Sequence, residues 1–132
     1  MTRVFKAQEI KVVTEDKPGT LARVTAPIAE ARVNLNAVCA YRAGKGKAEL
    51  LFITADNAKA KESLKKAGFE TTERDVVVVE TENEAGTMFR AAQQLAQAGV
   101  DLDYCYATAG SKGTTWIIFA TKAIEKALNV VP

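Results

Sequence analysis

The chain contains no histidine, and only two of its 132 residues are cysteine. Histidine is the commonest general base at neutral pH and the commonest metal ligand, so its absence argues against an enzyme and against a metal site. Cys39 and Cys105 stand far apart, with no CxxC motif, and we expect two thiols buried on strands rather than a disulfide. We therefore predict no catalytic residue, no metal site and no cofactor.

Long apolar runs are also missing. The longest, Trp116–Ala120, has the length of a strand, whereas a membrane-spanning helix needs about 20 residues. The first residues are not followed by the apolar stretch of a signal peptide. The formal net charge of +2 is too small to favour nucleic acid or an anionic membrane. We expect a cytoplasmic protein with neither nucleic acid nor membrane as a partner.

The sequence does contain an internal repeat. Gly19-Thr20-Leu21 aligns with Gly86-Thr87-Met88, which sets the offset at 67 residues, and the alignment continues without a gap over about forty positions. Such a gapless series at one offset indicates a duplication. We predict two tandem repeats, residues 1–74 and 75–132, the second shortened at its C-terminal end.

The spacing of apolar residues in the first repeat predicts the order βαββαβ, which is the ferredoxin-like α+β fold with an antiparallel sheet and two helices on one face. Leu21, Val24, Ile28 and Ala31 recur at helical spacing and predict one buried stripe. The predicted strands are 10–15, 35–41, 48–54 and 69–73, and the predicted helices begin near Pro18 and after Asp56.

The second repeat has only residues 129–132 left for its fourth strand. Either that strand is vestigial or the partner repeat completes the sheet. Arg32 stands where the second repeat has Gly99, just after a helix. That position is typically left-handed, so we expect Arg32 to have a strained backbone.

The βαββαβ order serves several functions, so the fold alone decides none of them. An RNA-recognition module needs stacking aromatic residues on its third strand, and residues 47–53 lack that pattern. A metal chaperone of this shape needs a CxxC motif in its first loop, and the sequence has no such motif. The glycines of residues 44–46 fit a hairpin turn better than a phosphate loop, since no helix follows. Small-molecule sensing remains.

The stretch Asp16-Lys17-Pro18-Gly19-Thr20-Leu21 is the informative one for sensing. A helix N-terminus offers unpaired N–H groups that suit a carboxylate, and Gly19 allows a ligand close to the backbone. Asp16 can receive an ammonium group, and we expect Asn34 at the same edge of the sheet. The alternative stays open that Asp16 and Pro18 only start a helix and Asn34 only tolerates a turn.

Asp16-Lys17-Pro18-Gly19-Thr20-Leu21 and the later Val33-Asn34-Leu35 together resemble the D-x-P-G-x-L and G-[VI]-N-[IL] signature of ACT domains. The resemblance covers both repeats, and the near absence of a linker is similar to stand-alone paired ACT proteins. It implies a ligand between two modules, touching the first strand–helix loop of one and the start of the second strand. The ligand-binding candidates are Thr14, Asp16, Pro18, Gly19, Thr20, Leu21 and Asn34, and in the second repeat Asn83, Gly86, Thr87, Met88 and Asp101.

The second repeat departs from this signature, because Ala85 replaces the proline, Asn83 the aspartate and Asp101 the asparagine. Asp101 would repel a carboxylate, so the second site is expected to be altered or empty.

The resemblance implies a non-catalytic regulatory protein that binds a free amino acid. The alternative is an interaction subunit that docks on an amino-acid biosynthetic enzyme, as the regulatory subunit of acetolactate synthase does. Residues 76–79 and 116–119 are apolar at successive positions, so both faces of those strands carry apolar side chains. We expect a second copy of the chain to cover the helix-free face, which predicts a homodimer.

Overall fold

The computed structural model describes residues 2–109 and 113–130, which form six strands and four helices. Contacts divide the chain into two compact units: unit 2 is Gln8–Arg74, and unit 1 combines Met1–Ala7 with Asp75–Pro132. These units are defined by contacts, whereas the predicted repeats of residues 1–74 and 75–132 are defined by the sequence offset. No helix among the described residues has both the length and the apolarity needed to cross a membrane.

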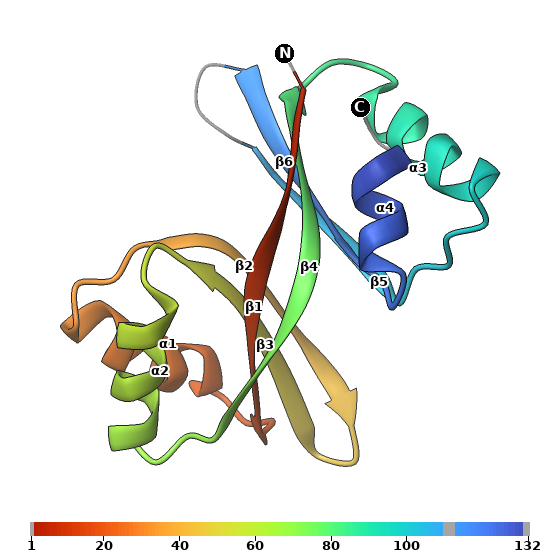
Figure 1. Cartoon of the computed structure of the whole chain (residues 1–132). Helices are drawn as coiled ribbons and strands as arrows, with labels where there is room; N and C mark the ends of the chain where they lie inside the picture. Colours follow the sequence, from red (N-terminus) through yellow and green to blue (C-terminus); the bar gives the residue numbers. More distant parts are fainter. Residues whose placement is uncertain (1, 110–112, 131–132) are drawn as a thin grey trace. The chain divides into compact units, whose positions relative to one another are not determined.

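Unit 2 has the strand order β2-β3-β1-β4. Its elements are the later part of β1 (Arg3–Glu15), α1 (Thr20–Glu30), β2 (Leu35–Gly44), β3 (Lys47–Thr54), α2 (Asn57–Lys66) and the start of β4 (Thr71–Glu82). Strand β3 pairs antiparallel with both β1 and β2, and α1 and α2 cover one face of these strands (Figure 1). The core lies between sheet and helices and is built from Ile10, Val12, Val24, Ile28, Val33, Ala48, Leu50, Phe52, Ala60 and Leu64.

Unit 1 has the same arrangement, with the strand order β5-β6-β4-β1. It contains the later part of β4, then α3 (Thr87–Gln97), β5 (Tyr104–Ala109), β6 (Thr114–Ala120) and α4 (Ile124–Val130). Strand β6 pairs antiparallel with β4 and β5. The core residues are Val77, Val79, Ala91, Leu95, Val100, Ile117, Phe119 and Ala127. The predicted ferredoxin-like α+β fold, in two repeats with antiparallel strands, is therefore confirmed.

The start of β1 takes the fourth strand position of unit 1. Thr2 Oγ1 lies 3.1 Å from Thr81 Oγ1, and the Arg3 guanidinium pairs with the Glu80 carboxylate over 3.0 Å. The Trp116 indole also donates to Glu80 over 2.8 Å. The hydrogen bond from Trp116, and after it the one from Arg3, lowers the pKa of Glu80. Of the two alternatives for this strand, completion by the partner repeat is the one observed, because the start of β1 belongs to the first repeat and helix α4 continues through Asn129 to Val130. Residues 131–132 lie outside the described residues.

Strand β4 is one continuous strand, Thr71–Glu82, where two strands were predicted. No glycine, proline or asparagine interrupts this stretch, so nothing in it breaks the extended chain. Strand β1 likewise begins at Arg3 rather than at residue 10. Each of the two strands therefore contributes residues to both units.

Several burial predictions need correction. Leu21 is 51% exposed, because the buried face of α1 consists of Thr20, Val24 and Ile28 at a spacing of four residues, and Leu21 lies about 100° around the helix from Thr20. Cys39 is only partly buried and Cys105 is exposed, although both thiols are free as expected. Val76, Val78 and Ile118 are fully buried within this single chain. The predicted homodimer therefore cannot rest on the exposure of these side chains.

Candidate functional site

The loop between β1 and α1 is held by a buried threonine. The Thr20 hydroxyl accepts a hydrogen bond from the Lys17 N–H over 3.2 Å and lies 2.8 Å from the carbonyl oxygens of Glu15 and Lys17. The Arg23 guanidinium donates to the same hydroxyl over 3.0 Å. The Thr20 hydroxyl thus holds the loop together, and a binding role for Thr20 stays a prediction.

Helix α1 begins without a capping side chain and without an acidic residue in its first turn. Gly19, at its N-cap, has a left-handed backbone with φ 89°, which favours glycine. The Thr20 N–H bonds to the Lys17 carbonyl and the Arg23 N–H to the Gly19 carbonyl. Among the described residues, no acceptor meets the N–H groups of Leu21 and Ala22. This helix end therefore favours an anionic group.

Asp16 and the start of α1 share one cavity of about 350 Å³. Four of the predicted site residues line it, Asp16, Gly19, Thr20 and Leu21, together with Lys17 and residues of β2 and β3. The Asp16 N–H bonds to the Gly46 carbonyl over 2.8 Å, which ties the loop to the hairpin between β2 and β3. Thr14 pairs with Ala48 on β3, and exposed Pro18 offers its carbonyl to Arg23.

Three residues of β2 were not predicted as part of this site. Ala40, Tyr41 and Arg42 line the cavity, and the Arg42 guanidinium pairs with the Asp16 carboxylate over 2.5 Å. The signal available in the sequence was the hairpin at residues 44–46. It returns the chain beside the end of β1, and so places the last residues of β2 next to the loop.

Tyr41 belongs to a small polar network. Its hydroxyl donates to the Glu49 carboxylate over 2.6 Å, and the same carboxylate lies 3.7 Å from the Lys11 ammonium. Partial burial, followed by the hydrogen bond and the negative charge of Glu49, raises the pKa of Tyr41 to about 12. This phenol therefore stays protonated throughout the physiological range and acts as a donor.

Asn34 does not lie at the Asp16 end of the sheet, and this expectation was wrong. Glu15 pairs with Lys47 at the start of β3, whereas Leu35 pairs with Thr54 at its end. A helix that runs back antiparallel to β1 delivers the chain to the opposite end of the sheet. The eleven residues of α1 span about 16 Å. Asn34 of the same module therefore cannot reach a ligand beside Asp16.

Unit 1 repeats this geometry with different side chains. Gly86 has φ 89° at the start of α3, and the Asn83 N–H bonds to the Gly113 carbonyl as the Asp16 N–H bonds to the Gly46 carbonyl. Asp101 lies at the other end, where its carbonyl accepts a hydrogen bond from the Thr121 hydroxyl over 2.7 Å. The positions that correspond to Asp16 and Arg42 are Asn83 and Ala109, so both charged groups have been replaced together.

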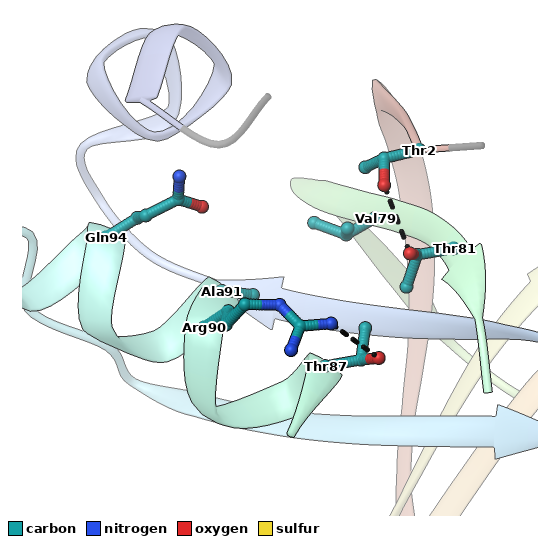
Figure 2. Close-up of a pocket in the computed structure, with 7 residues that line it drawn as sticks. All are labelled: Thr2, Val79, Thr81, Thr87, Arg90, Ala91 and Gln94. Carbon is teal, nitrogen blue, oxygen red and sulfur yellow. Dashed lines mark hydrogen bonds between the residues drawn. The ribbon is translucent and has the colours of Figure 1, made fainter. Parts of the chain in front are cut away.

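A second cavity, of about 140 Å³, lies in unit 1 beneath the first turns of α3 (Figure 2). It involves Thr87 among the predicted residues, while Met88 is 40% exposed at the surface. Its lining was otherwise not predicted. Among residues 2–109 and 113–130, no group of three or more histidine, cysteine, aspartate or glutamate residues is arranged to hold a metal ion.

These observations define a pair of ferredoxin-like modules, the second of which takes its fourth strand from the start of β1, and each has a helix that begins without a side-chain cap. The chain belongs to the ACT domain pair family, whose sequence profile matches residues 5–132.

Solved structures with the same fold include protein BT0572 from Bacteroides thetaiotaomicron, which is 26% identical with a TM-score of 0.86 over 96% of this chain and 87% of that one. The regulatory subunit of aspartate kinase from Thermus thermophilus, in its ligand-free form, is 19% identical with a TM-score of 0.70 over 98% and 93%. The same subunit from Thermus flavus is 20% identical with a TM-score of 0.65 over 98% and 93%. No curated protein matches the chain.

Proposed function

We propose that this protein is a non-catalytic regulator that binds a free amino acid at the start of α1 in unit 2. The observation that carries the proposal is the cavity lined by Asp16 and by Leu21, whose N–H group is unpaired at the start of α1 as is that of Ala22. A zwitterion needs opposite charges a few ångströms apart. The N–H groups suit its carboxylate and Asp16 suits its ammonium.

The proposed site involves Asn34 only through a second module. Asp16 and Asn34 of one module lie at opposite ends of its sheet. We therefore propose a homodimer in which Asn34 of one copy approaches the Asp16 cavity of the other. The amide would then offer both a donor and an acceptor to the ligand.

Unit 1 is proposed to have an altered site. Replacement of the Asp16 and Arg42 counterparts by Asn83 and Ala109 removes both charges, and Asp101 replaces the asparagine. A zwitterion would find no carboxylate at the position that corresponds to Asp16. We therefore expect amino-acid binding in unit 2 alone.

A second candidate function is that of an interaction subunit docking on a biosynthetic enzyme. What favours it is that the Thermus relatives are described as regulatory subunits of aspartate kinase, and that this chain matches 93% of each. The notion of an acetolactate synthase partner has no such support. An interaction subunit would act on its enzyme even without an amino acid.

A thermal-shift screen of the twenty amino acids separates the two functions. Binding to the folded state raises the unfolding temperature, and saturation at 100 times Kd contributes about 2.7 kcal/mol. We expect one amino acid, or one chemical class, to give a clear shift that Asp16→Asn removes. No shift with any of the twenty would contradict sensing and favour the interaction subunit.

A further inference from the structure

The cavity in unit 1 is lined by polar donors and by one positive charge. Figure 2 shows Arg90 and Gln94 extending from α3 on one side, and Thr2 and Thr81 on the facing strands. Arg90 donates to the Thr87 hydroxyl over 3.3 Å. No carboxylate among residues 2–109 and 113–130 pairs with Arg90, so its charge is uncompensated by the described protein.

The cavity has a structural cause in how unit 1 obtains its fourth strand. In unit 2 the chain enters that strand position through Phe69, which packs against the core. In unit 1 the corresponding strand is the start of β1, where Thr2 and Arg3 come before Val4, and Val4 is the first residue to pack on the core. At the repeat offset of 67 residues Thr2 corresponds to Phe69, so a smaller side chain lines this end of unit 1, where about 140 Å³ is open.

The lining selects for one class of ligand. Thr2 and Thr81 share one hydrogen bond, which uses one of their two hydroxyl hydrogens, while the other hydroxyl hydrogen, the Gln94 amide and the Arg90 guanidinium can donate to an anion. One guanidinium balances one negative charge, whereas a dianion would leave a net charge in a half-enclosed space. The apolar wall of Val79 and Ala91 accepts a methyl or methylene group.

We infer that unit 1 binds a small monocarboxylate, with its carboxylate on the Arg90 guanidinium and its carbon chain against Val79 and Ala91. The volume is several times that of one water, about 30 Å³, so it admits an ion of a few heavy atoms. This site is separate from the proposed amino-acid site of unit 2 in location and in charge. Either of the two proposals can therefore be overturned while the other stands.

The test is a titration of the ¹⁵N-labelled full chain with sodium acetate at pH 7, with sodium chloride at matched ionic strength as the reference. We expect saturable shifts of the Thr87 and Gln94 amides and of the Arg90 Nε–H. Sodium phosphate should bind more weakly than acetate. Arg90→Gln removes the charge while keeping the length of the side chain, and we expect it to weaken acetate binding about tenfold or more.

Arg23→Gln is the matched control, since Arg23 holds the equivalent position in α1 and bonds to the equivalent threonine. It should leave acetate binding unchanged. Arg90→Lys keeps the charge and should retain most of the affinity, and Thr81→Val provides a second loss-of-binding variant if Arg90→Gln does not fold. Absence of saturable shifts in the wild type overturns the proposal. So does acetate affinity in Arg90→Gln within twofold of wild type, or phosphate binding that exceeds acetate.

Discussion

The Arg42 guanidinium donates a hydrogen bond to the Asp16 carboxylate over 2.5 Å, and so joins the end of β2 to the loop that follows β1. The guanidinium is largely exposed, with 80% of the side chain accessible, while the Asp16 side chain is only 27% accessible. The pair therefore contributes little to stability but occupies the carboxylate that an amino-acid ligand would use.

Asp16→Asn and Arg42→Gln should have opposite effects on binding. The first removes the carboxylate that faces the ammonium, and we expect affinity to fall by about 1–3 kcal/mol. The second frees Asp16 from a competing cation, and we expect affinity to rise about two- to fivefold, with unfolding free energy changed by less than about 1 kcal/mol. Calorimetry with the amino acid found in the screen measures both. Equal weakening by the two variants would place the ligand's carboxylate on Arg42 instead.

Gly19→Leu should abolish binding, and Gly86→Leu should not. Both glycines have φ 89°. Either substitution therefore puts a residue with a side chain into the left-handed region, which costs about 1–2 kcal/mol of stability. Only Gly19 lines the Asp16 cavity. The matched loss of stability, checked by denaturant unfolding, separates strain from blocked access. Wild-type affinity in Gly19→Leu would show that the ligand binds elsewhere.

Arg32→Gly should stabilise the protein by up to about 1 kcal/mol, because Arg32 has φ 59° just after α1, as the sequence predicted. Gly99 holds the same position after α3 with φ 73°, and a Cβ there would meet nothing closer than the Lys126 ammonium at 3.9 Å. The reverse change, Gly99→Arg, should therefore destabilise by about the same amount. Thermal unfolding of both variants tests the pair, and a lower unfolding temperature for Arg32→Gly would contradict the strain argument.

The predictable and unpredictable parts of this structure differ in their physical origin. Local sequence signals correctly predicted two features. Asp56 caps α2, where its carboxylate accepts a hydrogen bond from the Lys59 N–H, and Arg32 has a left-handed backbone. The position of Arg42 beside Asp16 depended on strand pairing, which the hairpin at residues 44–46 indicates only indirectly. The fourth strand of unit 1 comes from residues nearly eighty positions before the end of β4, so residues 129–132 could not show which part of the first repeat completes the sheet.

The raised pKa of Tyr41 predicts a loss of stability in alkali. Burial and Glu49 hold its folded-state pKa at about 12, above the ordinary value of 10.0. The contribution is complete below pH 10 and disappears as the pH rises to about 12, because the unfolded chain releases the proton first. Tyr41→Phe should flatten the dependence of unfolding free energy on pH in this range. Phenolate absorbance checks the assignment, since a tyrosine transition near pH 12 should vanish in this variant.

The separation of Asp16 from Asn34 makes the proposed dimer testable by complementation. If one site takes Asp16 from one copy and Asn34 from the other, Asp16→Asn and Asn34→Ala should each weaken binding in a pure dimer, the second by about 1–3 kcal/mol. A mixed dimer of the two variants would contain one site with both changes and one site with neither. Co-expression of the variants in equal amounts should thus restore about a quarter of all sites, as two-fold symmetry requires.

Calorimetry of the co-expressed mixture measures that restored fraction, and light scattering of the wild type gives the mass of the assembly. The pure Asp16→Asn dimer is the control for residual binding. A mixture that binds no better than its components would mean that Asn34 acts within its own copy or not at all. A mass near the 14.2 kDa of one chain would exclude the dimer directly. Since Val76, Val78 and Ile118 are already buried in the single chain, only this requirement for a second module argues for the dimer.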